Sequence, residues 1–182
     1  MSTIEYSEVL SFWFEEIDKK SWFKKDPTFD QSLMSRFGPL HSRAEQAELF
    51  SWRGTTEGRL AEIIVLDQFS RNLYRDTPRA FASDPLSLAL AQETVQQGLD
   101  STLAAEQKVF LYMPYMHSES KAVHVVAYSL FEKLGKDDNL EYEARHKAII
   151  DRFDRYPHRN SILGRESTPE ELEFLKQPGS TF

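Results

Sequence analysis

The sequence predicts an all-α fold of eight or nine short helices that stack as antiparallel hairpins. Apolar residues recur at helical spacing along most of the 182 residues. Prolines follow cap residues at three points, in Asp26-Pro27, Asp84-Pro85 and Thr168-Pro169. No segment alternates apolar and polar residues as a strand does, so we expect a helix content of roughly 60–75%, about twice the average of soluble proteins.

Cap and breaker residues divide the first half of the chain into helices. Ser2 and Glu5 have the spacing of a capping box, and Asp26-Pro27 combines an N-cap with a proline in the first turn. Gly38-Pro39 is expected to break or kink the second helix. The expected helices cover residues 4–16, 27–37, 39–50 and 60–74.

The same signals divide the second half. Asp84-Pro85 starts a helix that Gly98 closes, and Gly135 ends a later apolar stripe. A further helix is expected to end before Pro114. The expected starts lie near residues 84, 101, 123, 142 and 168. Because the connections are short and the length suits one domain, we expect residues 1–182 to form a single helical domain.

The composition excludes several classes of function. A net charge of −7 argues against nucleic-acid and anionic-membrane partners, since both need a basic face. The chain has no cysteine, so it has neither a disulfide framework nor a cysteine zinc site, and we expect a cytoplasmic protein. No phosphate loop, dinucleotide fingerprint or nucleophile elbow occurs, so the cofactor is unknown.

A first polar cluster consists of Asp67, Gln68, Arg71, Asn72 and Arg75. Asp67 and Arg71 are four residues apart and continue the apolar face of residues 60–64, so we expect Asp67 to be buried and paired with Arg71. The cluster is either an internal ion pair that locks helices together or the floor of a pocket in which Arg71 and Arg75 bind an anion.

A second cluster, His117-Ser118-Glu119, follows Pro114 and precedes a helix. His117 and Glu119 are the candidate acid–base pair. The alternative is a structural role, as a helix cap or a hydrogen-bonded core histidine. No two histidines lie four residues apart, as a zincin helix requires, so we expect no metal site.

A third cluster lies in the C-terminal region. Residues 152–165 contain four arginines and one acid, in a chain that is acidic overall. Arginine is suited to bidentate contacts with carboxylates and phosphates, so this block is either an anion site or a set of ties to acids elsewhere. The candidate ligand-binding residues are His146, Arg152, Arg155, His158, Arg159 and Asn160.

Three motifs together resemble a known bacterial family, catalogued as domain of unknown function 924. The motifs are Leu66-Asp-Gln-Phe-Ser-Arg-Asn72, Tyr112-Met-Pro-Tyr-Met-His-Ser-Glu119 and His146-Lys-Ala-Ile-Ile-Asp-Arg-Phe153 with Arg155-Tyr-Pro-His-Arg-Asn160. The resemblance covers nearly the whole chain and implies a compact helical fold, a tetratricopeptide-like superhelical bundle, without an established activity. The chain departs from the family pattern at Asp76 and Asp154, where glycine is usual, and at His124, where glutamine is usual.

The leading hypothesis is that the three clusters converge in one pocket for a small anionic ligand that carries phosphate or carboxylate groups. His117 and Glu119 would then supply acid–base chemistry for hydrolysis or transfer. The alternative is an interaction scaffold that binds a protein partner, in which the polar clusters are purely structural.

Overall fold

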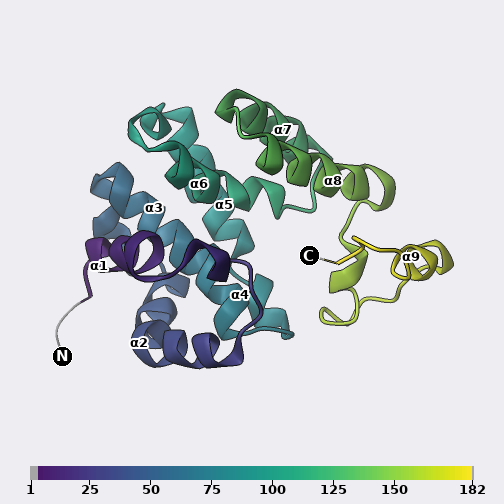
Figure 1. The fold of residues 1–182 in the computed structure, drawn as a ribbon, viewed down its shortest axis with the longest axis horizontal. Helices are drawn as coiled ribbons and strands as arrows, with labels where there is room; N and C mark the ends of the chain where they lie inside the picture. Colours follow the sequence, from purple (N-terminus) through teal and green to yellow (C-terminus); the bar gives the residue numbers. More distant parts are fainter. Residues whose placement is uncertain (1–3, 182) are drawn as a thin grey trace. The chain divides into compact units, whose positions relative to one another are not determined.

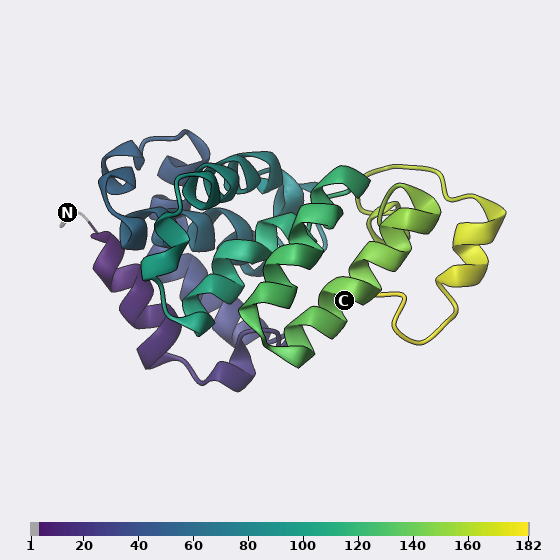
Figure 2. The same cartoon turned by 90° about the horizontal axis from the view of Figure 1, so that it is seen from above.

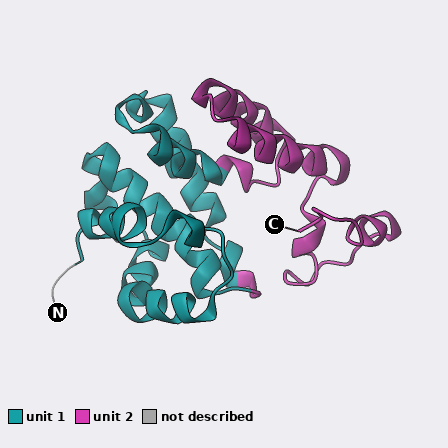
Figure 3. Cartoon of the chain, in the orientation of Figure 1, with its two compact units in different colours: residues 1–75, 79–114 teal, residues 76–78, 115–182 magenta. Residues whose placement is uncertain are grey.

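The computed structural model describes residues 4–181 and confirms the all-α prediction (Figure 1). Of the residues described, 72% are helical, and no strand occurs among them. By their contacts the residues group into two compact units (Figure 3). Unit 1 comprises Met1–Arg75 and Arg79–Pro114, and unit 2 comprises Asp76–Pro78 and Tyr115–Phe182. A single domain and a tetratricopeptide-like arrangement stay predictions.

The N-terminal helices of unit 1 differ from the expectation at Pro39. They are α1 (Tyr6–Ser11), a π-helical turn (Phe12–Glu16) and α2 (Pro27–Glu45). Glu5 and Glu8 form the capping box of α1, whereas Ser2 lies outside the described residues. The predicted break at Gly38-Pro39 is wrong, because α2 continues through Pro39. Pro39 is exposed, and the other face of α2 buries Leu33, Phe37, Leu40, His41 and Ala44. That burial outweighs the roughly 3 kcal/mol that an internal proline costs.

The central helix is interrupted where one regular helix was expected. It consists of α3 (Thr56–Ile64), a π-helical turn (Val65–Phe69) and α4 (Ser70–Leu73). The Thr55 hydroxyl accepts a hydrogen bond from Gly58 N–H and caps α3. All residues of the π-helical turn are buried, including Asp67. Asp67 therefore lies in the core on a π-helical turn and not on a regular α-helix.

Two further helices complete unit 1, α5 (Asp84–Gln96) and α6 (Ala105–Met116), although the last two residues of α6 belong to unit 2. Ser83 rather than Asp84 is the N-cap of α5. The prediction that a helix ends before Pro114 is wrong, since Pro114 lies inside α6. The core of unit 1 is aromatic: ring centroids of Trp13 and Phe110 lie 5.6 Å apart, as do those of Trp13 and Phe69.

Unit 2 is built on a helical hairpin. In two perpendicular views, α7 (Lys121–Leu134) and α8 (Asp137–Phe153) lie side by side (Figures 1 and 2). Gly135 joins them in the left-handed conformation, with φ 69°. A 3-10 turn (Pro157–Arg159) and α9 (Pro169–Phe174) follow. Within the described range, no helix combines the length and the apolar character that crossing a bilayer requires.

Two of the aspartates where the resemblance implies glycine occupy left-handed backbone positions. Asp154 ends α8 with φ 58°, and Asp76 has φ 60°. A side chain is strained in this region, although aspartate tolerates it better than most residues, and glycine is not strained there. Glycine would therefore be unstrained at both positions.

Candidate functional site

The first cluster, in unit 1, forms buried ion pairs. Asp67 is fully buried, and its Oδ1 lies 3.2 Å from Arg71 Nη1, as predicted. Arg71 also donates two hydrogen bonds to Asp84, at 2.9 and 3.0 Å. The guanidinium of Arg71 is therefore shared between two carboxylates, which is the arrangement of a structural tie.

Asn72 and Arg75 meet a third carboxylate, that of Asp30 on α2. Asn72 Nδ2 donates to Asp30 Oδ1 at 2.8 Å, and Arg75 donates to both Asp30 oxygens at 2.9 and 3.0 Å. These bonds connect α4 with α2. The contacts of this cluster match the reading in which the polar groups lock helices together.

The second and third clusters meet in unit 2, at Glu119. Its carboxylate accepts two hydrogen bonds from Arg165, at 2.6 and 2.9 Å, and one from Tyr156 N–H at 2.7 Å. Burial alone would raise the pKa of Glu119, but the bonds from Arg165 and Tyr156 prevail and lower it. Glu119 is therefore held as a carboxylate in a structural anchor. Its assignment as an acid–base residue stays a prediction, as does the meeting of the first cluster with the other two.

Three consecutive carbonyl groups, of the last residue of α6 and the two residues after it, receive hydrogen bonds from side chains. Tyr156 Oη donates to Met116 O at 2.5 Å, and Arg159 Nη2 donates to His117 O at 3.1 Å. His124 Nε2 lies 2.8 Å from Ser118 O. The last carbonyls of a helix lack intrahelical partners, so these side chains cap α6. They also fix the backbone on both sides of His117.

Tyr156 is the centre of a histidine-rich cluster. It is fully buried, and its ring centroid lies 6.3, 5.7 and 5.6 Å from the rings of His124, His146 and His158. The guanidinium carbon of Arg159 lies 4.6 Å from the Tyr156 ring centroid. With His117, whose carbonyl is bound by Arg159, this region of unit 2 holds four of the five histidines in the chain. We call these six residues the Tyr156 cluster.

His146 is held as a neutral imidazole. Its Nδ1 lies 2.7 Å from the Tyr142 carbonyl oxygen, which only accepts, so Nδ1 carries the hydrogen and Nε2 the lone pair. Burial is the main cause that lowers the pKa of His146 to about 3; the bond to Tyr142 opposes this shift, and the positive charge of Arg159 adds to it.

Glu143 was missed by the sequence analysis. It is fully buried, with Oε1 2.8 Å from His124 Nδ1. Glu143 lies three residues before His146 and seven before Ile150, so it falls on the buried face of α8. That helical spacing was the signal that could have revealed it.

The remaining residues of the third cluster tie the C-terminal segment. Arg155 donates to both oxygens of Glu171, at 2.6 and 2.8 Å, which lowers the pKa of Glu171 to about 2. Arg152 pairs with Glu170 at the surface. Asn160 accepts from Arg165 at 2.9 Å. These contacts do not support the prediction that Arg152 and Arg155 bind an anionic ligand.

No group of three or more histidine, cysteine or acidic side chains within the described range could hold a metal ion. One cavity, of about 450 Å³, lies at the N-terminus of α3 in unit 1. Its walls include Thr55, Arg53, Arg59 and Gln97, and none of the predicted site residues.

Two comparisons place the chain among proteins without a known activity. The family model described as "Bacterial protein of unknown function (DUF924)" matches residues 9–179. A solved structure of a protein of unknown function from Agrobacterium tumefaciens is 37% identical, with a TM-score of 0.89, and the match covers 94% of this chain and 96% of that one. No curated protein matches the chain.

Proposed function

The chain belongs to the DUF924 family of bacterial proteins of unknown function, and we propose that it binds a small anionic ligand at the Tyr156 cluster and acts on it by acid–base chemistry. The observation that carries this proposal is the gathering of three histidine rings and Arg159 around one buried tyrosine, with the carbonyl of a fourth histidine, His117, bound by Arg159. Histidine is the side chain best suited to proton transfer near neutral pH, and clusters of perturbed titratable groups mark functional sites.

Positive charge within the Tyr156 cluster supports an anionic ligand. Burial is the main reason that His146 stays unprotonated, and the fixed positive charge of Arg159 acts in the same direction. A phosphate or carboxylate bound beside Arg159 would offset its charge and raise the pKa of His146. Binding of the anion would thereby activate the base.

His117 and His158 would give the ligand access, because both are only half-buried whereas His146 and Arg159 are buried. In this arrangement His117 contacts the ligand at the opening, and Arg159 supplies the fixed positive charge. His146 Nε2 would accept the proton, because its Nδ1 is already engaged with Tyr142. The sequence also suggested Arg71, Arg75 and Arg155 as ligand-binding residues. We do not assign them this role, because each makes a bidentate contact with a protein carboxylate.

The test is ligand binding by the wild type and two variants. We expect inorganic phosphate or phosphorylated metabolites to raise the melting temperature of the wild type, and His146→Asn to abolish this increase. Asparagine retains a donor for the Tyr142 carbonyl but lacks the Nε2 lone pair, so the local fold is preserved. The matched control is Arg152→Gln, which removes a charge from an exposed ion pair and leaves binding unchanged.

A complementary measurement is the histidine titration by NMR. We expect saturating phosphate to raise the pKa of His146 above its value in the free protein. If no phosphate- or carboxylate-bearing compound changes either the melting temperature or this titration, the anion-binding proposal is wrong.

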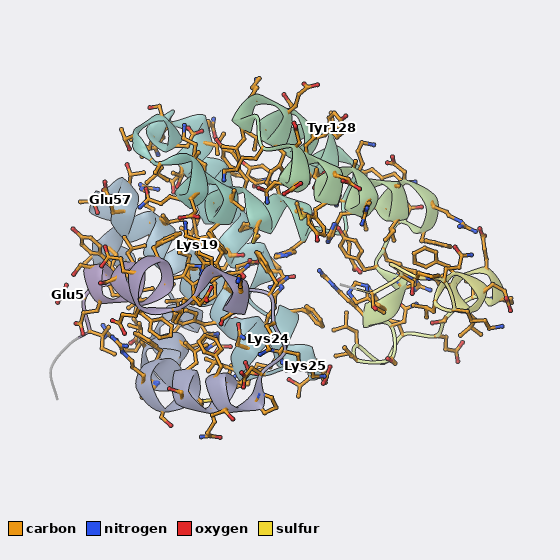
Figure 4. The ribbon with its side chains drawn as sticks, viewed as in Figure 1. Glu5, Lys19, Lys24, Lys25, Glu57 and Tyr128 are labelled. Atoms are coloured by element: carbon orange, nitrogen blue, oxygen red, sulfur yellow. The ribbon has the colours of Figure 1, made fainter. Side chains whose placement is uncertain are left out.

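The second candidate function is an interaction scaffold that binds a protein partner. Exposed apolar side chains on α7 favour it. Val125 is 62% exposed, Val126 45% and Tyr128 38%. Figure 4 labels Tyr128 on this helix. Soluble proteins rarely leave a contiguous apolar patch uncovered without a partner, although single exposed side chains are normal. Substitution of both valines by serine should weaken association with a partner protein without changing phosphate binding.

A further inference from the structure

Hydrogen-bond partners restrict the protonation of the buried pair His124 and Glu143. His124 Nε2 faces the Ser118 carbonyl oxygen at 2.8 Å, and a carbonyl only accepts, so Nε2 carries a hydrogen. His124 Nδ1 and Glu143 Oε1 are 2.8 Å apart, which places one more proton between them. The pair is thus either an imidazolium with a carboxylate or a neutral imidazole with a protonated carboxyl group.

The surroundings of Glu143 favour the neutral form. Its second oxygen, Oε2, is buried and has no hydrogen-bond partner among the described residues. An unpartnered oxygen costs far more in a buried carboxylate than in a protonated carboxyl group. Burial raises the pKa of Glu143, while His124 and then Lys147 act to lower it.

Through His124, the pair also helps to fix the backbone on which His117 lies. His124 is one of three side chains that bind the consecutive carbonyls of residues 116–118, and Tyr156 Oη also lies 3.1 Å from His124 Nε2. The backbone of this turn therefore cannot rotate without breaking hydrogen bonds made by buried groups. Its rigidity fixes the point from which the His117 side chain projects.

We propose that His124 and Glu143 form a neutral positioning pair that orients His117 in the Tyr156 cluster. The role of His117 towards a ligand rests on the proposed function, whereas the protonation of the pair does not. Because a neutral imidazole offers one donor and one acceptor, a glutamine at position 124 can make the same two contacts.

The protonation state is tested on the wild-type protein without ligand. We expect the ¹⁵N chemical shifts of His124 at neutral pH to be those of a neutral imidazole with hydrogen on Nε2. Shifts typical of an imidazolium would overturn the neutral pair.

Two substitutions at position 143 test the positioning role. Glu143→Gln imitates the protonated carboxyl group, so it should keep the melting temperature, the His117 titration and the affinity for inorganic phosphate. Glu143→Leu has a similar volume but no donor. It should shift the His117 titration and weaken phosphate binding at least about tenfold, since small displacements of a positioned group have large effects. His124→Gln should behave as Glu143→Gln does.

The outcomes separate this inference from the proposed function. If the wild type does not bind phosphate but Glu143→Gln preserves the His117 titration that Glu143→Leu shifts, the proposed function fails and the positioning pair stands. If Glu143→Gln disturbs His117 as strongly as Glu143→Leu, the pair is ionised and the inference is wrong.

Discussion

The strongest test of the unit 2 structure is removal of the Glu119 carboxylate. Glu119→Ala leaves the buried Tyr156 N–H without its acceptor, which costs about 1–3 kcal/mol. It also removes the bidentate contact with Arg165, in which both side chains are about one-quarter exposed, so the loss is smaller than for a fully buried pair. We expect the free energy of unfolding to fall by about 3 kcal/mol in total.

Glu119→Gln separates the two contributions. Glutamine keeps an oxygen for Tyr156 N–H but loses the charge, so the expected loss is about 1–2 kcal/mol. Urea unfolding followed by circular dichroism measures both variants. Glu170→Gln is the matched control, because its exposed pair with Arg152 is worth about 0–1 kcal/mol. Equal losses for alanine and glutamine at position 119, or no loss for either, would refute this reasoning.

Three further predictions concern stability. Asp67→Ala should cost about 2–3 kcal/mol, less than a lone buried pair would, because Arg71 keeps its bidentate contact with Asp84; an unchanged thermal midpoint would contradict this. Asp154→Gly should stabilise by about 1 kcal/mol in chemical denaturation, since φ is 58° there. Glu171 has a pKa of about 2 when folded, below its ordinary 4.5, so acidification from pH 4.5 towards 2 should lower stability. Glu171→Gln should remove about 1 kcal/mol of that dependence, measured by thermal unfolding at each pH.

Local signals in the sequence predicted several helix ends correctly. Asp26 and Thr168 cap the helices that they were expected to cap, and Gly98 and Gly135 adopt the left-handed conformation after helices. Such ends depend on residues within one turn, so they are readable from the sequence. The helix breaks predicted at Pro39 and Pro114 were wrong. Burial of a helix face is a tertiary effect, so a local pattern does not show that it outweighs an internal proline. Pro39 is the clearest case.

Partners of the polar residues were less predictable. The pair of Asp67 and Arg71 follows from a spacing of four residues and was confirmed. The acceptor of Arg75 is Asp30, 45 positions away, and no local pattern indicates that contact. The π-helical turn at Val65–Phe69 likewise has no sequence signature that we could recognise.

The carbonyl groups of residues 116–118 have a consequence for the order of folding. Tyr156 and Arg159 reach them across 40 and 42 positions, whereas α7 and α8 are joined by a turn of only two residues. Closing a short loop costs less chain entropy than closing a long one, so the hairpin is expected to form first. Its formation shortens the effective loop between the turn and Tyr156. The His117 turn should then become rigid only in the last step, when the C-terminal segment docks.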